Sequence, residues 1–188
     1  MTTTRSPRDR ETAYRAFFTA THDDLLRFVQ RRVHPSHAED VVADALLTAW
    51  RRFDDAPDSL DRQRAWAFGI ARRCLLNTHR GLDRQEALSV RLAEAVPTST
   101  PPGSDPDLIA ARVDLAAAWR ELTSSQQEVL ALSVLDGLSA PDAARVLDTT
   151  PVAFRLRLMR ARAALKARLP SHSTTLTRQN PEASRENA

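Results

Sequence analysis

Apolar residues recur along this chain at the three- and four-residue spacing of amphipathic helices, and no stretch shows the alternation of a strand. The clearest pattern follows Thr150 and Pro151. Thr150 is a favoured N-cap, and Pro151 stands at the first helical position, where proline is common because its missing N–H has no partner to lose. The buried face of that helix is predicted to consist of Phe154, Leu158, Ala161 and Leu165. The pattern as a whole predicts an all-α protein.

A shorter helix is expected just before this one, within the stretch Leu138–Leu169. Ser139 is a favourable N-cap, and Asp142 places an acid in the first turn. A short helix, a tight turn and a longer basic helix make a helix-turn-helix, whose second helix enters the major groove of DNA. An ordinary helical hairpin with a solvated basic side is the alternative that this stretch leaves open.

The first half of the chain predicts three further helices. Residues 11–33 form the first, which Pro35 is expected to end. Ser36 and Glu39 have the spacing of a capping box and predict the start of the second. A loop is expected over Phe53–Asp61, followed by a long helix over Leu60–Arg80.

The second half predicts a fraying helix over residues 81–95 and helices again from Asp107. The helix from Asp107 is expected to bury one face, consisting of Leu108, Leu115, Trp119 and Leu122. A capping box at Thr123 and Gln126 then begins a core helix that Gly137 stops. The core positions predicted on it are Val129, Leu130, Leu132, Val134 and Leu135.

These segments predict two small helical domains joined by a flexible linker. Residues 96–106 are rich in proline, serine and threonine and are predicted to be the linker. It separates a first domain, 11–95, from a second, 107–169, which contains the helix-turn-helix. Residues 1–10 and 170–188 are polar and are expected to be disordered.

Composition limits the function classes. The pI near 9.9 reflects many arginines, which cluster on the last predicted helix. Cys74 is the only cysteine, and the histidines are scattered, so we predict no disulfide, metal site, cofactor or catalytic centre. No apolar run is long enough to span a membrane, and Met1–Arg10 lacks the apolar core of a signal peptide, which favours a cytoplasmic protein.

Two separated stretches, taken together, resemble a known family. Residues 38–50 (AEDVVADALLTAW) and 64–73 (RAWAFGIARR) form the first, and residues 122–130 (LTSSQQEVL), 137–139 (GLS) and 160–165 (RARAAL) form the second. In this order, with a proline-rich linker between them, they resemble the two domains of an extracytoplasmic-function sigma factor, a small sigma subunit of bacterial RNA polymerase.

The resemblance implies roles for the first domain. It should bind core RNA polymerase through the residues Asp40, Asp44, Thr48 and Arg51. It should also hold the melted minus-ten promoter strand, with a flipped base at the Phe53–Asp61 loop and backbone contacts from Arg72, Arg73 and Arg80. Taken without the resemblance, such an acidic face is more often plain solvent surface than a docking site, and the basic strip is likewise interpreted as solvated surface.

For the second domain, the resemblance implies recognition of the minus-thirty-five element as duplex DNA. The residues expected to do so are Arg155, Leu156, Arg157, Met159 and Arg160. Leu156 stands where the family usually has a polar residue. The family implies no catalysed reaction, and an anti-sigma factor is a candidate partner beside core polymerase and promoter DNA. The rival class is a two-domain helix-turn-helix regulator that does not dock on polymerase.

Overall fold

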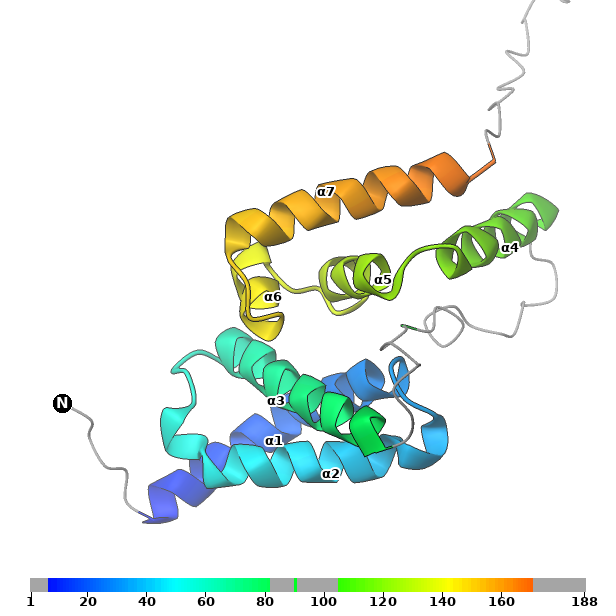
Figure 1. Cartoon of the computed structure of the whole chain (residues 1–188). Coiled ribbons are helices and arrows are strands. Elements are labelled where there is room, and N and C mark those ends of the chain that lie inside the picture. Colours follow the sequence, from blue (N-terminus) through cyan, green and yellow to red (C-terminus); the bar gives the residue numbers. More distant parts are fainter. Residues whose placement is uncertain (1–6, 82–89, 91–104, 171–188) are drawn as a thin grey trace, which may run out of the picture.

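The computed structural model describes residues 7–81, Val90 and residues 105–170, with the backbone alone at Pro7 and at residues 78–81. These residues form helices and the turns between them, which confirms the all-α prediction (Figure 1). The first group of elements is α1 (Pro7–Gln30), α2 (Pro35–Arg51), the 3-10 turn η1 (Phe53–Asp55) and α3 (Leu60–Gly81). The second is α4 (Pro106–Arg120), α5 (Ser124–Leu130), the π turn η2 (Ala131–Leu135), α6 (Ala140–Val146) and α7 (Pro151–Arg168).

The first domain packs α1, α2 and α3 around an aromatic core. The rings of Phe28 and Phe68 stack with their centroids 4.5 Å apart and join α1 to α3. The Tyr14 hydroxyl donates a hydrogen bond to the Leu46 carbonyl at 2.8 Å and joins α1 to α2. The largest fully buried side chains of this domain include Phe17, Phe28, Phe53 and Phe68.

The second domain contains the predicted helix-turn-helix, made by α6 and α7. The caps at Ser139 and Thr150 are confirmed, because each hydroxyl accepts a hydrogen bond from the backbone N–H three residues later. The capping box of Thr123 and Gln126 is also present. The predicted stripe of α7 is confirmed as well, with Phe154, Leu158 and Ala161 buried and Leu165 partly buried.

The first helix begins earlier than predicted. α1 starts at Pro7, within the stretch 1–10 that was expected to be disordered. Arg10 explains the extension, because its guanidinium donates a hydrogen bond to the Trp50 carbonyl at 2.5 Å and lies 4.2 Å from the centre of the Trp50 ring. This contact on α2 orders the first turns of α1.

The start of α2 also differs from the prediction. Pro35 is its first residue rather than the end of α1, and the ring nitrogen of His34 accepts a hydrogen bond from the Ser36 N–H. Proline has no N–H to satisfy at the first helical position, so the cap lies one residue before it. The predicted capping box of Ser36 and Glu39 is therefore wrong.

The core helix expected to end at Gly137 changes its winding after α5. In η2 the Asp136 N–H donates to the Ala131 carbonyl at 2.8 Å, which is the wider spacing of a π turn. The extra residue rotates the helix faces, so Val134, predicted in the core, is 64% exposed. Gly137 stops the turn as predicted, with a φ of +64°, and Asp136 is buried.

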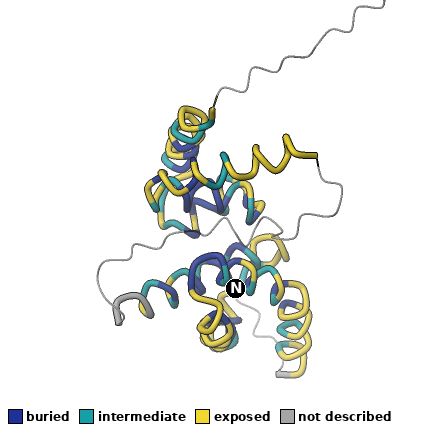
Figure 2. Tube along the Cα trace, turned by 90° about the vertical axis from the view of Figure 1, so that its right-hand side faces the viewer, coloured by how far each residue is buried: buried dark blue, intermediate teal, exposed yellow. Residues whose placement is uncertain are grey.

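The prediction of the buried face of α4 is correct only for the second half of the helix. Trp119 and Leu122 are buried and Leu115 is partly buried, but Leu108 is exposed. Residues 105–113 are all exposed because the first half of α4 extends away from the second domain, as the yellow end of the tube shows (Figure 2). The predicted linker up to residue 104, the 82–89 and 91–95 parts of the fraying helix, and the tail after Pro170 lie outside the described residues.

The two domains pack against each other. α6 lies on α3, and the end of η2 reaches the C-terminal end of α1 (Figure 1). Val90 belongs to this connection too, because its carbonyl accepts a hydrogen bond from the Trp119 indole at 2.7 Å and its N–H donates to Gln127 at 3.1 Å. The helix-turn-helix domain is thus placed over the long helix of the first domain.

We expect Gly137→Ala to lower the free energy of unfolding by about 1 kcal/mol, because a Cβ is strained at positive φ. Gly69→Ala, in the middle of α3, is the matched control and should raise it by roughly 0.5–1 kcal/mol. At both positions an added Cβ meets no neighbouring atom within 4 Å, so packing does not enter. Urea unfolding measures both; equal shifts would contradict the strain at Gly137.

Candidate nucleic-acid and partner interfaces

The outer face of α2 carries the four residues that the sequence assigned to polymerase. Asp40, Asp44 and Arg51 are exposed and Thr48 is half-buried, on the side opposite the buried stripe of this helix. Sequence reasoning missed Leu47, which is 47% exposed on the same face. The helical spacing could have identified it, since at 100° per residue Leu47 lies about 20° from Asp40 around the helix. The face therefore combines acids with one exposed leucine.

Asp44 also influences Cys74 on α3. Burial raises the pKa of the Cys74 thiol, and the negative charge of Asp44 raises it further, while a hydrogen bond with the backbone lowers it. Cys74 is partly accessible, so its reactivity can report on this charge.

Two arginines of the basic strip of α3 form ion pairs with the second domain, although Arg73 keeps 61% of its side chain exposed. Arg72 forms an ion pair with Glu128 of α5, with 3.7 Å between Nε and Oε1. Arg73 forms one with Asp148, in the turn between α6 and α7, at 3.4 Å between Nη2 and Oδ2. The structure brings these two arginines together on one helix and pairs both with the second domain. The side chain of Arg80 lies outside the described residues.

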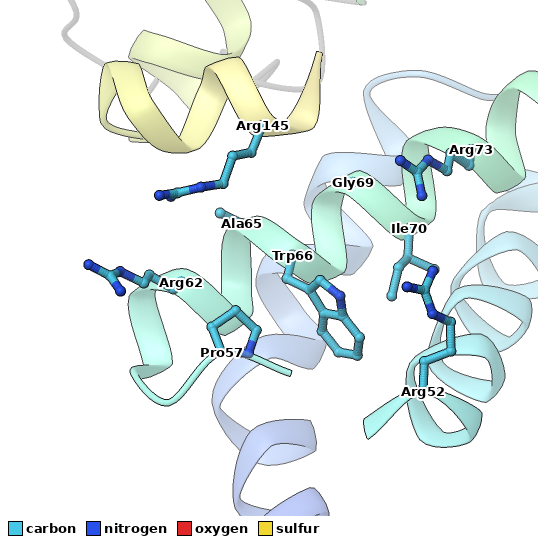
Figure 3. Close-up of a pocket in the computed structure, with 9 residues that line it drawn as sticks. All are labelled: Arg52, Pro57, Arg62, Ala65, Trp66, Gly69, Ile70, Arg73 and Arg145. Atoms are coloured by element: carbon cyan, nitrogen blue, oxygen red, sulfur yellow. The ribbon is translucent and has the colours of Figure 1, made fainter. Parts of the chain in front are cut away.

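A cavity of about 390 Å³ opens beside the first half of α3 (Figure 3). The expected base-holding segment contributes Pro57 to its wall, and α3 contributes Trp66, whose indole points into the space. Arginines surround it, and one of them, Arg145, comes from α6 of the second domain. The complete lining consists of Arg52, Pro57, Arg62, Ala65, Trp66, Gly69, Ile70, Arg73 and Arg145.

The outer face of α7 holds the residues that the sequence assigned to duplex DNA. Arg155, Arg157 and Arg160 are exposed, as are Leu156 (42%) and Met159 (60%). Sequence reasoning missed Val152, which is 72% exposed. At 100° per residue, Val152, Leu156 and Met159 fall within about 60° of one another. They form an apolar strip opposite the buried stripe.

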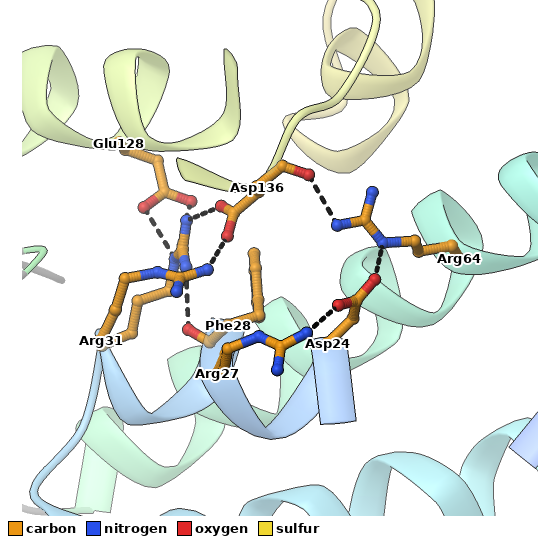
Figure 4. A network of polar contacts seen from close by, with 8 residues as sticks. Asp24, Arg27, Phe28, Arg31, Arg64, Glu128 and Asp136 are labelled. Atoms are coloured by element: carbon orange, nitrogen blue, oxygen red, sulfur yellow. Dashed lines mark hydrogen bonds and ion pairs between the residues drawn. The ribbon is translucent and has the colours of Figure 1, made fainter. Parts of the chain in front are cut away.

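A buried network of charges joins the domains (Figure 4). Arg32, in the turn just after α1, has a fully buried side chain; its Nη2 donates to Asp136 Oδ2 at 2.8 Å and its Nε to Glu128 Oε2 at 3.1 Å. Arg31 pairs with the other carboxylate oxygen of Asp136. Arg64 of α3 donates to the backbone carbonyl of Asp136 at 2.8 Å. The sequence carried no signal for these contacts, which join residues far apart in the chain.

The described part of the chain lacks two kinds of feature. Its helices include none that is long and apolar enough to cross a membrane. Its histidine, cysteine and acidic side chains form no group of three or more that could hold a metal ion.

The geometry defines a class: a two-domain helical protein with a helix-turn-helix and an arginine-lined cavity, both suited to nucleic acid. Comparisons with known proteins identify the family. Residues 17–85 match the model described as Sigma-70 region 2, and residues 112–165 match that described as Sigma-70, region 4.

Two relatives and two solved structures are similar to this chain. The RNA polymerase sigma factor NccH of Alcaligenes xylosoxydans xylosoxydans is 33% identical over 148 residues, covering 74% of this chain and 76% of the relative. The ECF RNA polymerase sigma factor SigL of Mycobacterium tuberculosis is 29% identical over 147 residues, covering 74% and 78%. The structure of CnrH in complex with the cytosolic domain of CnrY, CnrH being a sigma factor of Cupriavidus metallidurans, aligns with a TM-score of 0.57 at 28% identity, covering 87% and 91%.

The sigma factor RpoE of Bartonella quintana, in complex with the anti-sigma factor NepR, aligns with a TM-score of 0.57 over 86% of this chain and 97% of that one. At 23% identity it supports the fold alone. The chain belongs to the extracytoplasmic-function sigma factors of RNA polymerase. Its function is therefore that of an alternative sigma subunit, and the rival class of regulator without polymerase docking is set aside.

We expect Asp44→Asn to lower the pKa of the Cys74 thiol, because a negative charge that disfavours the thiolate is removed. The thiolate is the reactive form, so alkylation of Cys74 by iodoacetamide should become faster near pH 8. Its rate–pH curve should shift to lower pH. Asp40→Asn, one turn earlier on α2, is the matched control and should leave the curve in place. An unchanged curve for Asp44→Asn would contradict the coupling.

Proposed function

We propose that this sigma factor uses three surfaces: the outer face of α2 for core RNA polymerase, the α3 side of the first domain for the melted minus-ten strand, and the outer face of α7 for the minus-thirty-five duplex. The observation that carries the proposal is the arginine-lined cavity on α3 in the same chain as an exposed recognition helix. Each surface has the residue types that its partner requires.

The α2 face suits a protein partner that presents basic and apolar groups. Asp40 and Asp44 supply the charge, and the exposed side chain of Leu47 supplies an apolar anchor beside them. Interfaces of this kind gain specificity and association rate from complementary charge, and affinity from a buried apolar centre. We assign Asp40, Asp44, Thr48 and Arg51 to polymerase binding, and we add Leu47 to them.

The α3 cavity suits an unstacked base with its flanking phosphates. Trp66 offers an aromatic surface for stacking, which is worth about 1–3 kcal/mol per base in single-strand complexes. Arg52, Arg62 and Arg73 line the rim with positive charge. Arg72, Arg73 and Arg80 are assigned to the strand backbone, with Arg73 at the rim of the cavity, and each contact with a phosphate would release a counterion.

The outer face of α7 suits the major groove. Arg155, Arg157 and Arg160 can donate hydrogen bonds to base edges or phosphates. Leu156 and Met159 have no such donor, and the apolar feature of the major groove is the methyl group of thymine. We therefore propose that Arg155 positions the helix and that Leu156 selects thymine-containing minus-thirty-five elements.

No chemistry is assigned to the chain itself. We propose that it is not an enzyme, needs no cofactor and acts in the cytoplasm, with core RNA polymerase and promoter DNA as partners. Because two similar sigma factors were solved with CnrY and with an anti-sigma factor, NepR, we include an anti-sigma factor among the partners. In vitro transcription with core polymerase, using the gene's own upstream region as template, tests the proposal directly. The absence of a specific transcript in this assay would overturn the proposal.

We expect the double variant Asp40→Arg with Asp44→Arg to weaken binding to core polymerase at least tenfold, because like charges across an interface cost several kcal/mol. Helicity should not change, since both side chains point away from the core. Asp23→Arg with Glu121→Arg makes the same change in net charge on exposed positions elsewhere and is the control. Equal affinity of the two double variants for core would contradict the docking assignment.

Leu156→Ser should change which minus-thirty-five sequences are selected in holoenzyme, with thymine losing a preference of roughly fourfold, the value of about 0.8 kcal/mol for one apolar group. Arg155→Ala should instead weaken binding to most sequences. Val134→Ser removes an exposed valine off the recognition helix and is the control for Leu156→Ser. Unchanged selection with Leu156→Ser, or a large drop in its melting temperature, would reject the readout role.

A further inference from the structure

The cavity of about 390 Å³ beside α3 has the residue types of a site for a small, doubly anionic ligand. Four of its nine lining residues are arginines and none is an acid; the arginines are Arg52, Arg62, Arg73 and Arg145. We propose that in free sigma this cavity binds a free nucleotide that carries phosphate groups at two separate positions of its ribose. The site itself is argued from the cavity and does not require the proposed function of α3.

The arginines form two pairs with an aromatic ring between them (Figure 3). Arg62 and Arg145 lie on one side of the Trp66 indole, and Arg52 and Arg73 lie on the other. Like charges that line one small space repel each other, and an anion held between them removes the repulsion. The arrangement therefore suits two separate anionic groups, one for each pair, with a planar ring between them.

The pair formed by Arg52 and Arg73 has only weak competing partners. Arg52 Nε lies 3.4 Å from Asp55 Oδ2, and Arg73 Nη2 lies 3.4 Å from Asp148 Oδ2. About half or more of each of these four side chains is exposed, and ion pairs between exposed groups contribute little stability. A phosphate offers each guanidinium two acceptor oxygens in a geometry that matches its donors, so it can replace such a carboxylate.

The opposite pair is still less engaged. Arg145 forms an ion pair with Asp142, three residues before it on α6. Among the described residues, the guanidinium of Arg62 has no hydrogen-bond or ion-pair partner. An arginine that lines a cavity without a carboxylate partner is available to an anion from solution.

The middle of the cavity suits a flat ring. Trp66 offers its indole for stacking, and Ala65, Gly69 and Ile70 complete an apolar surface beside it. A Cβ added at Gly69 would meet no atom within 4 Å, so the space beside the indole is open. A nucleobase is the common biological ring that stacks on tryptophan and is joined to phosphates.

Arg145 distinguishes a ligand of free sigma from a promoter strand. It comes from α6 of the second domain, whereas the strand roles proposed above use residues of the first domain alone. A ligand that contacts all four arginines therefore binds the arrangement described here, in which α6 lies on α3. The volume of the cavity also falls within the range of about 300–1,000 Å³ that is typical of small-molecule sites.

Occupation of this cavity by a nucleotide would affect promoter binding. The base of the ligand takes the place on Trp66 that the proposed function gives to a flipped promoter base. One stacking surface cannot hold both bases, so the nucleotide and the minus-ten strand compete for sigma by mass action. This consequence, unlike the site itself, rests on the proposed function.

The first test titrates the full-length chain, without core polymerase, with adenosine 3′,5′-bisphosphate in a calorimeter. We expect one site per chain. Adenosine 5′-phosphate should bind about tenfold more weakly, because one pair of arginines loses its phosphate. Adenosine, which lacks phosphate, and pyrophosphate, which lacks the ring, should be weaker still. The absence of saturable binding, or equal binding of pyrophosphate and the bisphosphate, would overturn the inference.

Arg145→Gln should weaken binding of the bisphosphate about tenfold, because a charge-assisted contact with phosphate is lost. Arg15→Gln is the matched control and should bind as the parent does. Arg15, like Arg145, is an exposed helical arginine that pairs with an acid on its own helix. Equal affinity of Arg145→Gln and the parent would contradict the site of four arginines.

Gly69→Leu places a large side chain in the open space beside Trp66 and should abolish binding of the bisphosphate. Gly69→Ala adds a single methyl group and should keep the affinity within about threefold. Leucine and alanine both favour a helix over glycine, so neither change should unfold α3, and urea unfolding checks this. If Gly69→Leu bound as tightly as the parent, the ligand would lie elsewhere and the inference would be wrong.

Binding of a labelled minus-ten oligonucleotide by sigma with core polymerase separates this inference from the proposed function. Arg145 has no role in the strand complex, so Arg145→Gln should bind the oligonucleotide as the parent does. An equal loss of affinity for the oligonucleotide and for the nucleotide would overturn the inference, because Arg145 would then serve the strand. If the parent does not bind the oligonucleotide, the proposed function fails, and the titrations of free sigma still decide the nucleotide site.

Discussion

The structure depends on one buried guanidinium, that of Arg32. A charged group with no exposed surface requires partners, because the penalty for taking an ion out of water is several kcal/mol even after relaxation. Phe28 supplies a carbonyl and a ring from the first domain, but the counter-charges come from Glu128 and Asp136 of the second. The first domain therefore leaves a charge at its surface that only another molecule or domain can complete.

Several features of the second domain follow from this requirement. The π turn, the left-handed glycine after it and the short α6 together hold Asp136 over the end of α1 and set α6 on α3. Replacing either carboxylate alone would leave a buried charge short of a partner, a change that costs about 3–5 kcal/mol when a buried pair is broken. Buried charge thus contributes directly to the relative placement of the domains.

The sequence predicts features that depend on residues close together in the chain, and it misses contacts between residues that are far apart. The stripe of α7 and the caps at Ser139 and Thr150 are predictable because spacing and cap chemistry act within a few residues. Exposed site residues on α2 and α7 could be placed on their faces for the same reason. The π turn has no comparable signal, and the pairing of Arg32 with Asp136 joins residues more than a hundred positions apart. Neither a periodicity nor a motif records such a contact.

The two DNA surfaces differ in their access. The outer face of α7 is exposed, whereas Arg72 and Arg73 of α3 form ion pairs with the second domain. Under the proposed roles, α7 reads the minus-thirty-five element as duplex, which exists before melting, and the minus-ten strand becomes available only after it. Among the described residues, the arginines of α7 that are assigned to duplex DNA need no exchange of partner to meet it, whereas Arg72 of α3 already pairs with Glu128.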